Sequence, residues 1–223
     1  NQSLFGTYAF TASGKAGGNF ASVAGSVTFD GQGGVTGGVE DTLGAASATI
    51  TGGSYHVGSD GRGNLTLQTS AGPSTWQFIL VNHSQVLLES FDASPVLSGA
   101  LDAQDSTAFN AGAIQGNYSF LLSGAGGGNA IRSLNAAGAF AADGAGGLGS
   151  GFYDVNNAGT AATNLALTGS FTAPANTGRG TLTLSSSFGT QSFVYYVVDA
   201  THLKLMETDG TTGCTGEALK QVA

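Results

Sequence analysis

The sequence contains little cysteine, proline or charge. One cysteine, Cys214, and three prolines occur among 223 residues. A single thiol excludes an internal disulfide. Few prolines, and glycines that follow no triplet period, exclude a collagen-like triple helix. Because no run of about 18 apolar residues occurs, the sequence also excludes a transmembrane helix.

The few charged side chains are mostly acidic. Six basic and 14 acidic residues give a net charge of −8 at pH 7. The resulting negative field repels phosphate backbones and anionic lipids, so we expect no nucleic acid partner and no membrane insertion. Hydrophobic residues make up 41% of the chain, which is too many for a disordered acidic tail. The chain is therefore expected to fold.

Two features indicate secretion. The chain opens on Asn1 and its one methionine is Met206, as expected after removal of a signal peptide, although a trimmed chain would look the same. A lone cysteine suits a secreted bacterial protein that dispenses with disulfides. We therefore predict an extracellular or cell-surface protein of bacterial origin, with Cys214 as a buried and inert thiol.

The sequence is written twice, in the same order of motifs. GTYAF at 6–10 returns as GNYSF at 116–120, AGSVTFDGQGG at 24–34 as AGAFAADGAGG at 137–147, GRGNLTL at 61–67 as GRGTLTL at 178–184, and VLLE at 86–89 as KLME at 204–207. Such self-similarity indicates a tandem duplication of a structural unit. It predicts one module over 1–105, a linker over 106–113 and a second module over 114–223.

Within each module the hydrophobic pattern has a period of two, which is typical of half-buried strands. Asp-Gly pairs at 30–31, 60–61 and 143–144 follow strand-like segments and favour tight hairpin turns. The expected strands cover 5–13, 20–30, 35–43, 46–58, 63–70, 75–83, 85–92 and 96–104 in the first module. In the second they cover 116–124, 131–142, 148–156, 163–173, 179–187, 190–199, 202–209 and 213–221.

Eight short strands with short connections favour an all-β, up-and-down antiparallel meander. Closing such a meander removes its exposed edges, and the 38 glycines permit the coiling that closure needs. We therefore predict two tandem eight-stranded antiparallel up-and-down β-barrels. The alternative is two β-sandwiches.

The motifs carry two resemblances. Gly-x-Tyr, then Gly-x-Phe-x-x-Asp-Gly-x-Gly, then Gly-Arg-Gly-x-Leu-Thr-Leu resembles uncharacterised repeat modules of secreted or cell-surface bacterial proteins. The Gly-x-Tyr opening and the strand rhythm also resemble the calycin group of avidin-like and lipocalin-like barrels, in which the motif is Gly-x-Trp. This resemblance implies a ligand pocket, with Tyr8, Trp76 and Tyr118 as candidate contacts. Biotin is disfavoured because its binding in that group uses several tryptophans, and this chain has one.

Four charged residues occupy positions that the motif alignment makes equivalent in the two modules. Arg62 aligns with Arg179, and Glu89 aligns with Glu207. A buried carboxylate is costly unless it is paired, and arginine pairs with it bidentately. We therefore predict an Arg62–Glu89 pair and an Arg179–Glu207 pair, each closing one end of its barrel. Solvated charges and ligand contacts are the alternatives.

The sequence gives little support for catalysis or metal binding. His56, His83 and His202 form no metal-ligand spacing. The Asp-Gly-x-Gly-Gly segments lack the alternating acids of a calcium loop and are interpreted as hairpins. A glycosidase pair such as Glu40 and Glu89 would exist in one module only, because Tyr153 replaces Glu40 in the second. We therefore predict no catalytic residues, no metal and no cofactor.

These features together predict a secreted, non-enzymatic structural or interaction protein. A sparsely charged and duplicated surface is suited to contacts with copies of itself or with other cell-surface proteins, and repeated head-to-tail contacts would build a filament or a surface layer. The alternative is a calycin-like binding protein for a small apolar or glycan ligand held in a barrel.

Overall fold

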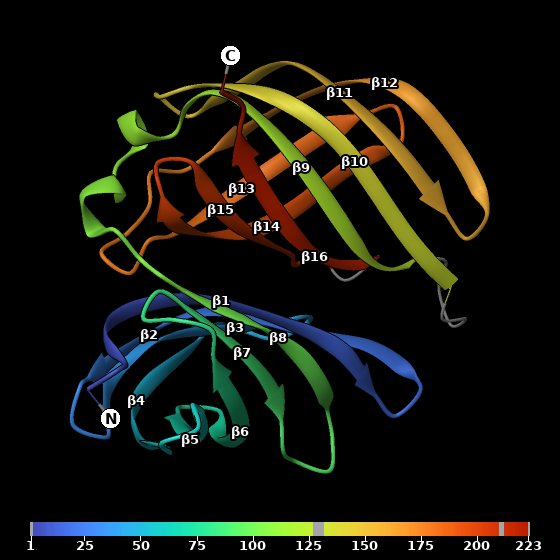
Figure 1. Ribbon diagram of the computed structural model, residues 1–223. Helices are drawn as coiled ribbons and strands as arrows, with labels where there is room; N and C mark the ends of the chain where they lie inside the picture. The colour runs from blue at the N-terminus through green and yellow to red at the C-terminus, as the bar shows by residue number, and fades with distance from the viewer. Residues whose placement is uncertain (1, 127–131, 210–211, 223) are drawn as a thin grey trace. The chain divides into compact units, whose positions relative to one another are not determined.

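The computed structural model describes residues 2–126, 132–209 and 212–222. The chain divides into two compact units, Asn1–Gln104 and Asp105–Ala223. Each unit contains a closed antiparallel barrel in which strands that follow one another in the sequence pair, and the last strand returns to the first (Figure 1). The predicted pair of eight-stranded up-and-down barrels is confirmed, and the sandwich alternative is excluded because each sheet closes on itself.

The strands alternate with short turns along almost the whole chain. Barrel 1 consists of β1 (Phe5–Ala16), β2 (Asn19–Asp30), β3 (Gly34–Thr42), β4 (Ala48–Val57), β5 (Arg62–Thr69), β6 (Gly72–Leu80), β7 (Gln85–Ser90) and β8 (Val96–Ala103). Barrel 2 consists of β9 (Gln115–Gly126), β10 (Arg132–Asp143), β11 (Gly147–Asn157), β12 (Thr160–Phe171), β13 (Arg179–Ser186), β14 (Gly189–Asp199), β15 (His202–Glu207) and β16 (Gly213–Lys220).

The segment expected to be a linker carries two short 3₁₀ helices, η1 (Ser106–Ala108) and η2 (Ala111–Ala113). The side chain of Asp105 caps η1 by accepting from Thr107 N, and the side chain of Asn110 caps η2. Ala108 is buried in the hydrophobic core of barrel 2. The segment therefore belongs to the second unit.

Alternation along the strands builds one continuous hydrophobic core inside each barrel. In barrel 1, the ring of Phe29 meets Tyr8 and Tyr55 edge to face, with centroids 5.5 Å and 5.0 Å apart. In barrel 2, Phe140 stacks on Tyr118 at 5.7 Å. These aromatic side chains fill much of each interior.

The glycine that follows arginine in the repeated Gly-Arg-Gly motif is required by packing. A Cβ at Gly63 would lie 2.2 Å from Cζ of Phe78, and one at Gly180 would lie 2.3 Å from Cζ of Tyr195. Because each ring lies flat against the neighbouring strand, any side chain at these positions would displace it. The Gly-Arg-Gly motif is therefore repeated because an aromatic ring packs on its second glycine in both barrels.

The Asp-Gly segments form hairpin turns, as the sequence predicts. Oδ1 of Asp30 accepts hydrogen bonds from the backbone N–H groups of Gln32, Gly33 and Gly34, at 2.7, 3.0 and 2.8 Å. Asp143 holds the equivalent turn in barrel 2. These backbone hydrogen bonds keep the pKa of both carboxyls below the ordinary value.

Candidate functional site

The two predicted arginine–glutamate pairs are wrong. Arg62 lies 2.7 Å from the carboxylate of Asp60, and both side chains are exposed. The structure describes Arg62 and Glu89 and shows no ion pair between them. The turn places Asp60 two residues from Arg62, and the flexible arginine side chain takes this nearer carboxylate.

The predicted Arg179–Glu207 pair fails because the motif alignment is shifted by one residue on β15. Phe193 pairs across the sheet with Glu207, whereas its equivalent Trp76 pairs with Ser90, not with Glu89. A slip of one residue moves a side chain to the opposite face of a strand. Glu207 therefore lies inside barrel 2 and is fully buried, whereas Glu89 and Arg179 lie on outer faces.

Glu207 is the centre of a buried polar network at one end of barrel 2. Its Oε1 accepts hydrogen bonds from Gln191 Nε2 at 3.0 Å and from Thr212 Oγ1 at 2.5 Å. Its Oε2 accepts from the thiol of Cys214 at 3.1 Å, and Tyr153 donates its hydroxyl to Gln191 Oε1 at 2.8 Å. The carboxylate is thus satisfied by donors of its own barrel, which is how a buried charge is tolerated.

This environment makes Cys214 unreactive. Burial, and then the negative charge of Glu207, raise the pKa of the thiol well above its ordinary value. Burial likewise raises the pKa of Tyr153. Because the thiolate is the nucleophilic form of cysteine, this arrangement suits a structural thiol, not a catalytic one.

Barrel 1 buries a different carboxylate. Glu40 pairs across the sheet with Gly25 on β2 and Ala48 on β4, so its side chain points into the barrel and is 8% exposed. Among the described residues, no group donates a hydrogen bond to its Oε2. Burial, and then the charge of Asp41, raise the pKa of Glu40 to about 7.

Glu40 and Glu89 do not form a glycosidase pair, since Glu40 points inward and Glu89 lies on the outer face of β7. Such a pair must flank one bound sugar from the same concavity. Strict alternation from the core residue Val35 would place Glu40 outside, but an irregularity in the pairing of β2 with β3 lies between Val35 and Gly37 and turns Glu40 to the inner face. Only the folded barrel shows that Glu89 does not face Glu40.

Tyr8 and Tyr118 close the other end of each barrel. Tyr8 donates its hydroxyl to the carbonyl of His83 at 2.5 Å, and Tyr118 donates to the carbonyl of Ala200 at 2.8 Å. The two acceptors occupy equivalent turns, β6–β7 and β14–β15. The repeated Gly-x-Tyr motif, and not the arginine–glutamate pairs, therefore closes one end of each barrel.

Trp76 is buried in barrel 1, where its Nε1 donates to Ser74 Oγ at 3.0 Å. Ser74 and Glu40 are the equivalents of Gln191 and Tyr153, which hydrogen-bond to each other in barrel 2, so Trp76 lies in the half of barrel 1 that holds Glu40. Ligand contact by Tyr8, Trp76 or Tyr118 stays a prediction.

The outer face of barrel 1 carries a shallow groove of about 530 Å³ over β6 and β7. Ile79, Leu87 and Phe91 line it and are 44%, 48% and 68% exposed. Ile79 and Leu87 are directly opposite across the two strands. Arg62 and Glu89 add one charge of each sign to the lining. Sequence alternation marks these apolar residues as outward, although it does not show that they gather in one groove.

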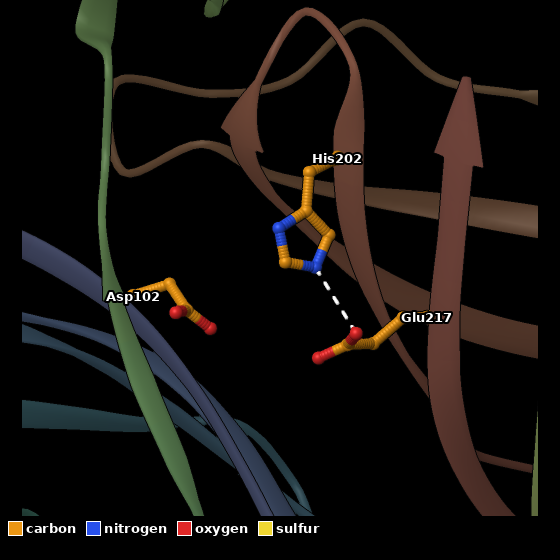
Figure 2. A group of neighbouring side chains, drawn as sticks. All are labelled: Asp102, His202 and Glu217. Atoms are coloured by element: carbon orange, nitrogen blue, oxygen red, sulfur yellow. Dashed lines mark ion pairs between the residues drawn. The ribbon is translucent and has the colours of Figure 1, made fainter. Parts of the chain in front are cut away.

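Barrel 2 carries a charged cluster on the outer face of β15 and β16. Glu217 lies 3.1 Å from Nζ of Lys204 and 3.4 Å from Nε2 of His202 (Figure 2). The His202 contact, and then the Lys204 charge, lower the pKa of Glu217 to about 2. Asp102, also drawn in Figure 2, belongs to barrel 1, where its Oδ1 accepts from Gln85 Nε2.

The fold defines the chain as a tandem pair of closed eight-stranded β-barrels. No family model matches it, and no curated protein matches it. In the part of the chain that the structure describes, no helix has the length and apolar character needed to span a bilayer.

Several solved structures are similar to the chain at low identity. A double mutant of transferrin binding protein B from Haemophilus parasuis gives a TM-score of 0.33 at 10% identity, over 95% of this chain and 60% of that one. A single mutant of the same protein gives 0.35 at 8% identity, over 97% and 76%. A DUF3598-family protein of unknown function from Nostoc punctiforme gives 0.28 at 11% identity, over 98% and 96%. The chain thus spans less than two thirds of the first of these structures.

Proposed function

We propose that this chain is a non-enzymatic, extracellular interaction protein of a bacterial surface, and that it associates with other copies of itself through the outer groove of barrel 1. The observation that carries the proposal is the exposure of Ile79, Leu87 and Phe91 together in one groove. Contiguous exposed apolar side chains are characteristic of interaction sites on folded domains.

The groove has the composition of a weak, reversible contact between identical chains. Its floor is apolar, so pairing two copies removes hydrophobic surface from water. Arg62 and Glu89 provide opposite charges on one surface. In a two-fold contact, Arg62 of one copy faces Glu89 of the next, and the reverse pair forms by symmetry.

Long-range charge opposes this association. Each chain carries a net charge of −8, so two copies repel one another at low ionic strength. Salt screens this repulsion more than it weakens the apolar contact. Self-association through the groove therefore strengthens as salt is raised. If the groove meets a different face of the next copy, the contact repeats and builds the filament predicted from the sequence.

Sedimentation velocity over a wide concentration range tests the proposal on the intact chain. Wild-type protein is expected to show concentration-dependent association that Leu87→Asp abolishes. Phe152→Asp is the matched control, because Phe152 is 50% exposed but belongs to barrel 2. A wild-type protein that stays monomeric at every concentration and salt level refutes self-association, as does unchanged association of Leu87→Asp.

The alternative of an apolar or glycan ligand in the centre of a barrel has less support. Buried aliphatic and aromatic side chains form one continuous cluster inside each barrel, and a filled core leaves little reason to expect an apolar guest there.

A further inference from the structure

Each barrel has an inward-facing carboxylate, and the two differ in their hydrogen-bond donors. Glu207 accepts hydrogen bonds from three side chains of barrel 2. Glu40 lies in the corresponding half of barrel 1, and its Oε2 has no donor among the described residues. Because the barrels share one fold, the difference lies in the side chains that surround each carboxylate.

Smaller residues line this end of barrel 1. At four equivalent positions, barrel 1 has Ala12, Ala21, Glu40 and Ala71 where barrel 2 has Leu122, Leu134, Tyr153 and Phe188. In barrel 2, the ring of Tyr153 packs near Phe120 and Phe188, each at 6.1 Å between centroids. The cross-strand neighbours of Glu40 are Gly25 and Ala48, which carry no side chain beyond Cβ.

Aromatic faces lie in the same half of barrel 1. The ring of Phe10 covers Gly25, where a Cβ would lie 2.3 Å from Cζ of Phe10, and Gly25 is the direct neighbour of Glu40. Trp76 enters this half of the barrel from β6. Aromatic faces attract organic cations and leave hydrogen bonding to the carboxylate.

We propose that the Glu40 end of barrel 1 binds a small organic cation with a primary ammonium group, which donates hydrogen bonds to Glu40 and packs against Phe10 and Trp76. A buried carboxylate oxygen without a donor favours a ligand that brings both positive charge and N–H groups. A metal ion is disfavoured, because one carboxylate supplies too few oxygen ligands for a hard cation. This site is separate from the outer groove and does not depend on self-association.

Trp76 provides the probe, because it is the single tryptophan of the chain. The intact protein is titrated with n-butylammonium chloride, and with 1-butanol as a neutral ligand of similar size. Trp76 fluorescence and calorimetry are followed at constant ionic strength. We expect saturable binding of the ammonium ion and none of the alcohol.

Three variants separate a specific site from a general salt effect. Glu40→Gln removes the charge and is expected to weaken binding by about tenfold or more. Ala71→Phe introduces the aromatic side chain of barrel 2 at an exposed turn and is expected to reduce binding while Glu40 is kept. Glu89→Gln, an exposed acid of the same barrel, is the matched control and is expected to bind like wild type.

The proposal is overturned if wild-type protein shows no saturable response to the ammonium ion in either measurement. Equal affinity in wild type and Glu40→Gln also overturns it, as does equal binding of 1-butanol. The outcome is independent of the oligomeric state, because Leu87→Asp, which tests the outer groove, leaves the Glu40 end unchanged.

Discussion

Replacing Glu40 by glutamine is expected to stabilise barrel 1 at alkaline pH and to have little effect at acidic pH. Burial, and then the charge of Asp41, raise the pKa of Glu40 from 4.5 to about 7 in the folded barrel. The unfolded chain releases this proton near the ordinary value, so the folded state binds more protons between the two values. The free energy of unfolding contributed by Glu40 therefore falls as pH rises through this window.

The size of the effect follows from the two values. A difference from 4.5 to about 7, at about 1.4 kcal/mol for each pH unit, corresponds to about 3 kcal/mol of lost stability above the folded pKa. Glutamine has nearly the same shape and cannot ionise. Glu40→Gln is therefore expected to raise the free energy of unfolding by up to about 3 kcal/mol near pH 8 and by close to nothing near pH 4.

Urea unfolding of the intact chain, followed by Trp76 fluorescence at several pH values, measures this difference in barrel 1. Subtracting the variant from the wild type removes the contribution of every other titrating group. Glu89→Gln is the control and is expected to show no such pH-dependent gain. A wild-type minus Glu40→Gln difference that stays constant from about pH 4 to pH 8 would refute the reasoning.

Three further predictions concern packing and the buried network. Cys214, whose thiol pKa is raised by burial and by Glu207, is expected to resist Ellman's reagent until barrel 2 unfolds, and immediate stoichiometric labelling of the native chain would contradict this. Glu207→Ala leaves buried donors unpaired and is expected to destabilise barrel 2 by about 2 kcal/mol or more, measured by near-ultraviolet circular dichroism of its tyrosines; wild-type stability would count against the network. Gly63→Ala brings a Cβ against Phe78 and is expected to lower stability by about 1–3 kcal/mol, whereas Gly18→Ala, which has open space around it, is expected to change it little in the same urea assay.

The motif alignment succeeded where a motif contains a glycine or a turn and failed where it does not. The Asp-Gly segments and the Gly-Arg-Gly motif align correctly, because a hairpin or a ring packed on a glycine allows one register only. The segment before Glu207 contains no such marker, and the similarity of VLLE to KLME led to the alignment of Glu207 with Glu89. In the structure, the residue equivalent to Glu207 is Ser90, one position further along the strand than Glu89. This difference of one residue places the carboxylate of Glu207 in the interior and that of Glu89 on the surface.

The sequence by itself determined the duplication and the strand order and favoured closed barrels over sandwiches, because strand alternation, turn residues and short connections are local properties that permit few topologies. Only the tertiary structure decided which carboxylate each barrel buries and whether it finds donors. Gln191, Cys214 and Glu207 come from three strands and meet only when barrel 2 closes. Hydrogen-bond partners depend on distances across the barrel, and these are not encoded in the pattern of any single strand.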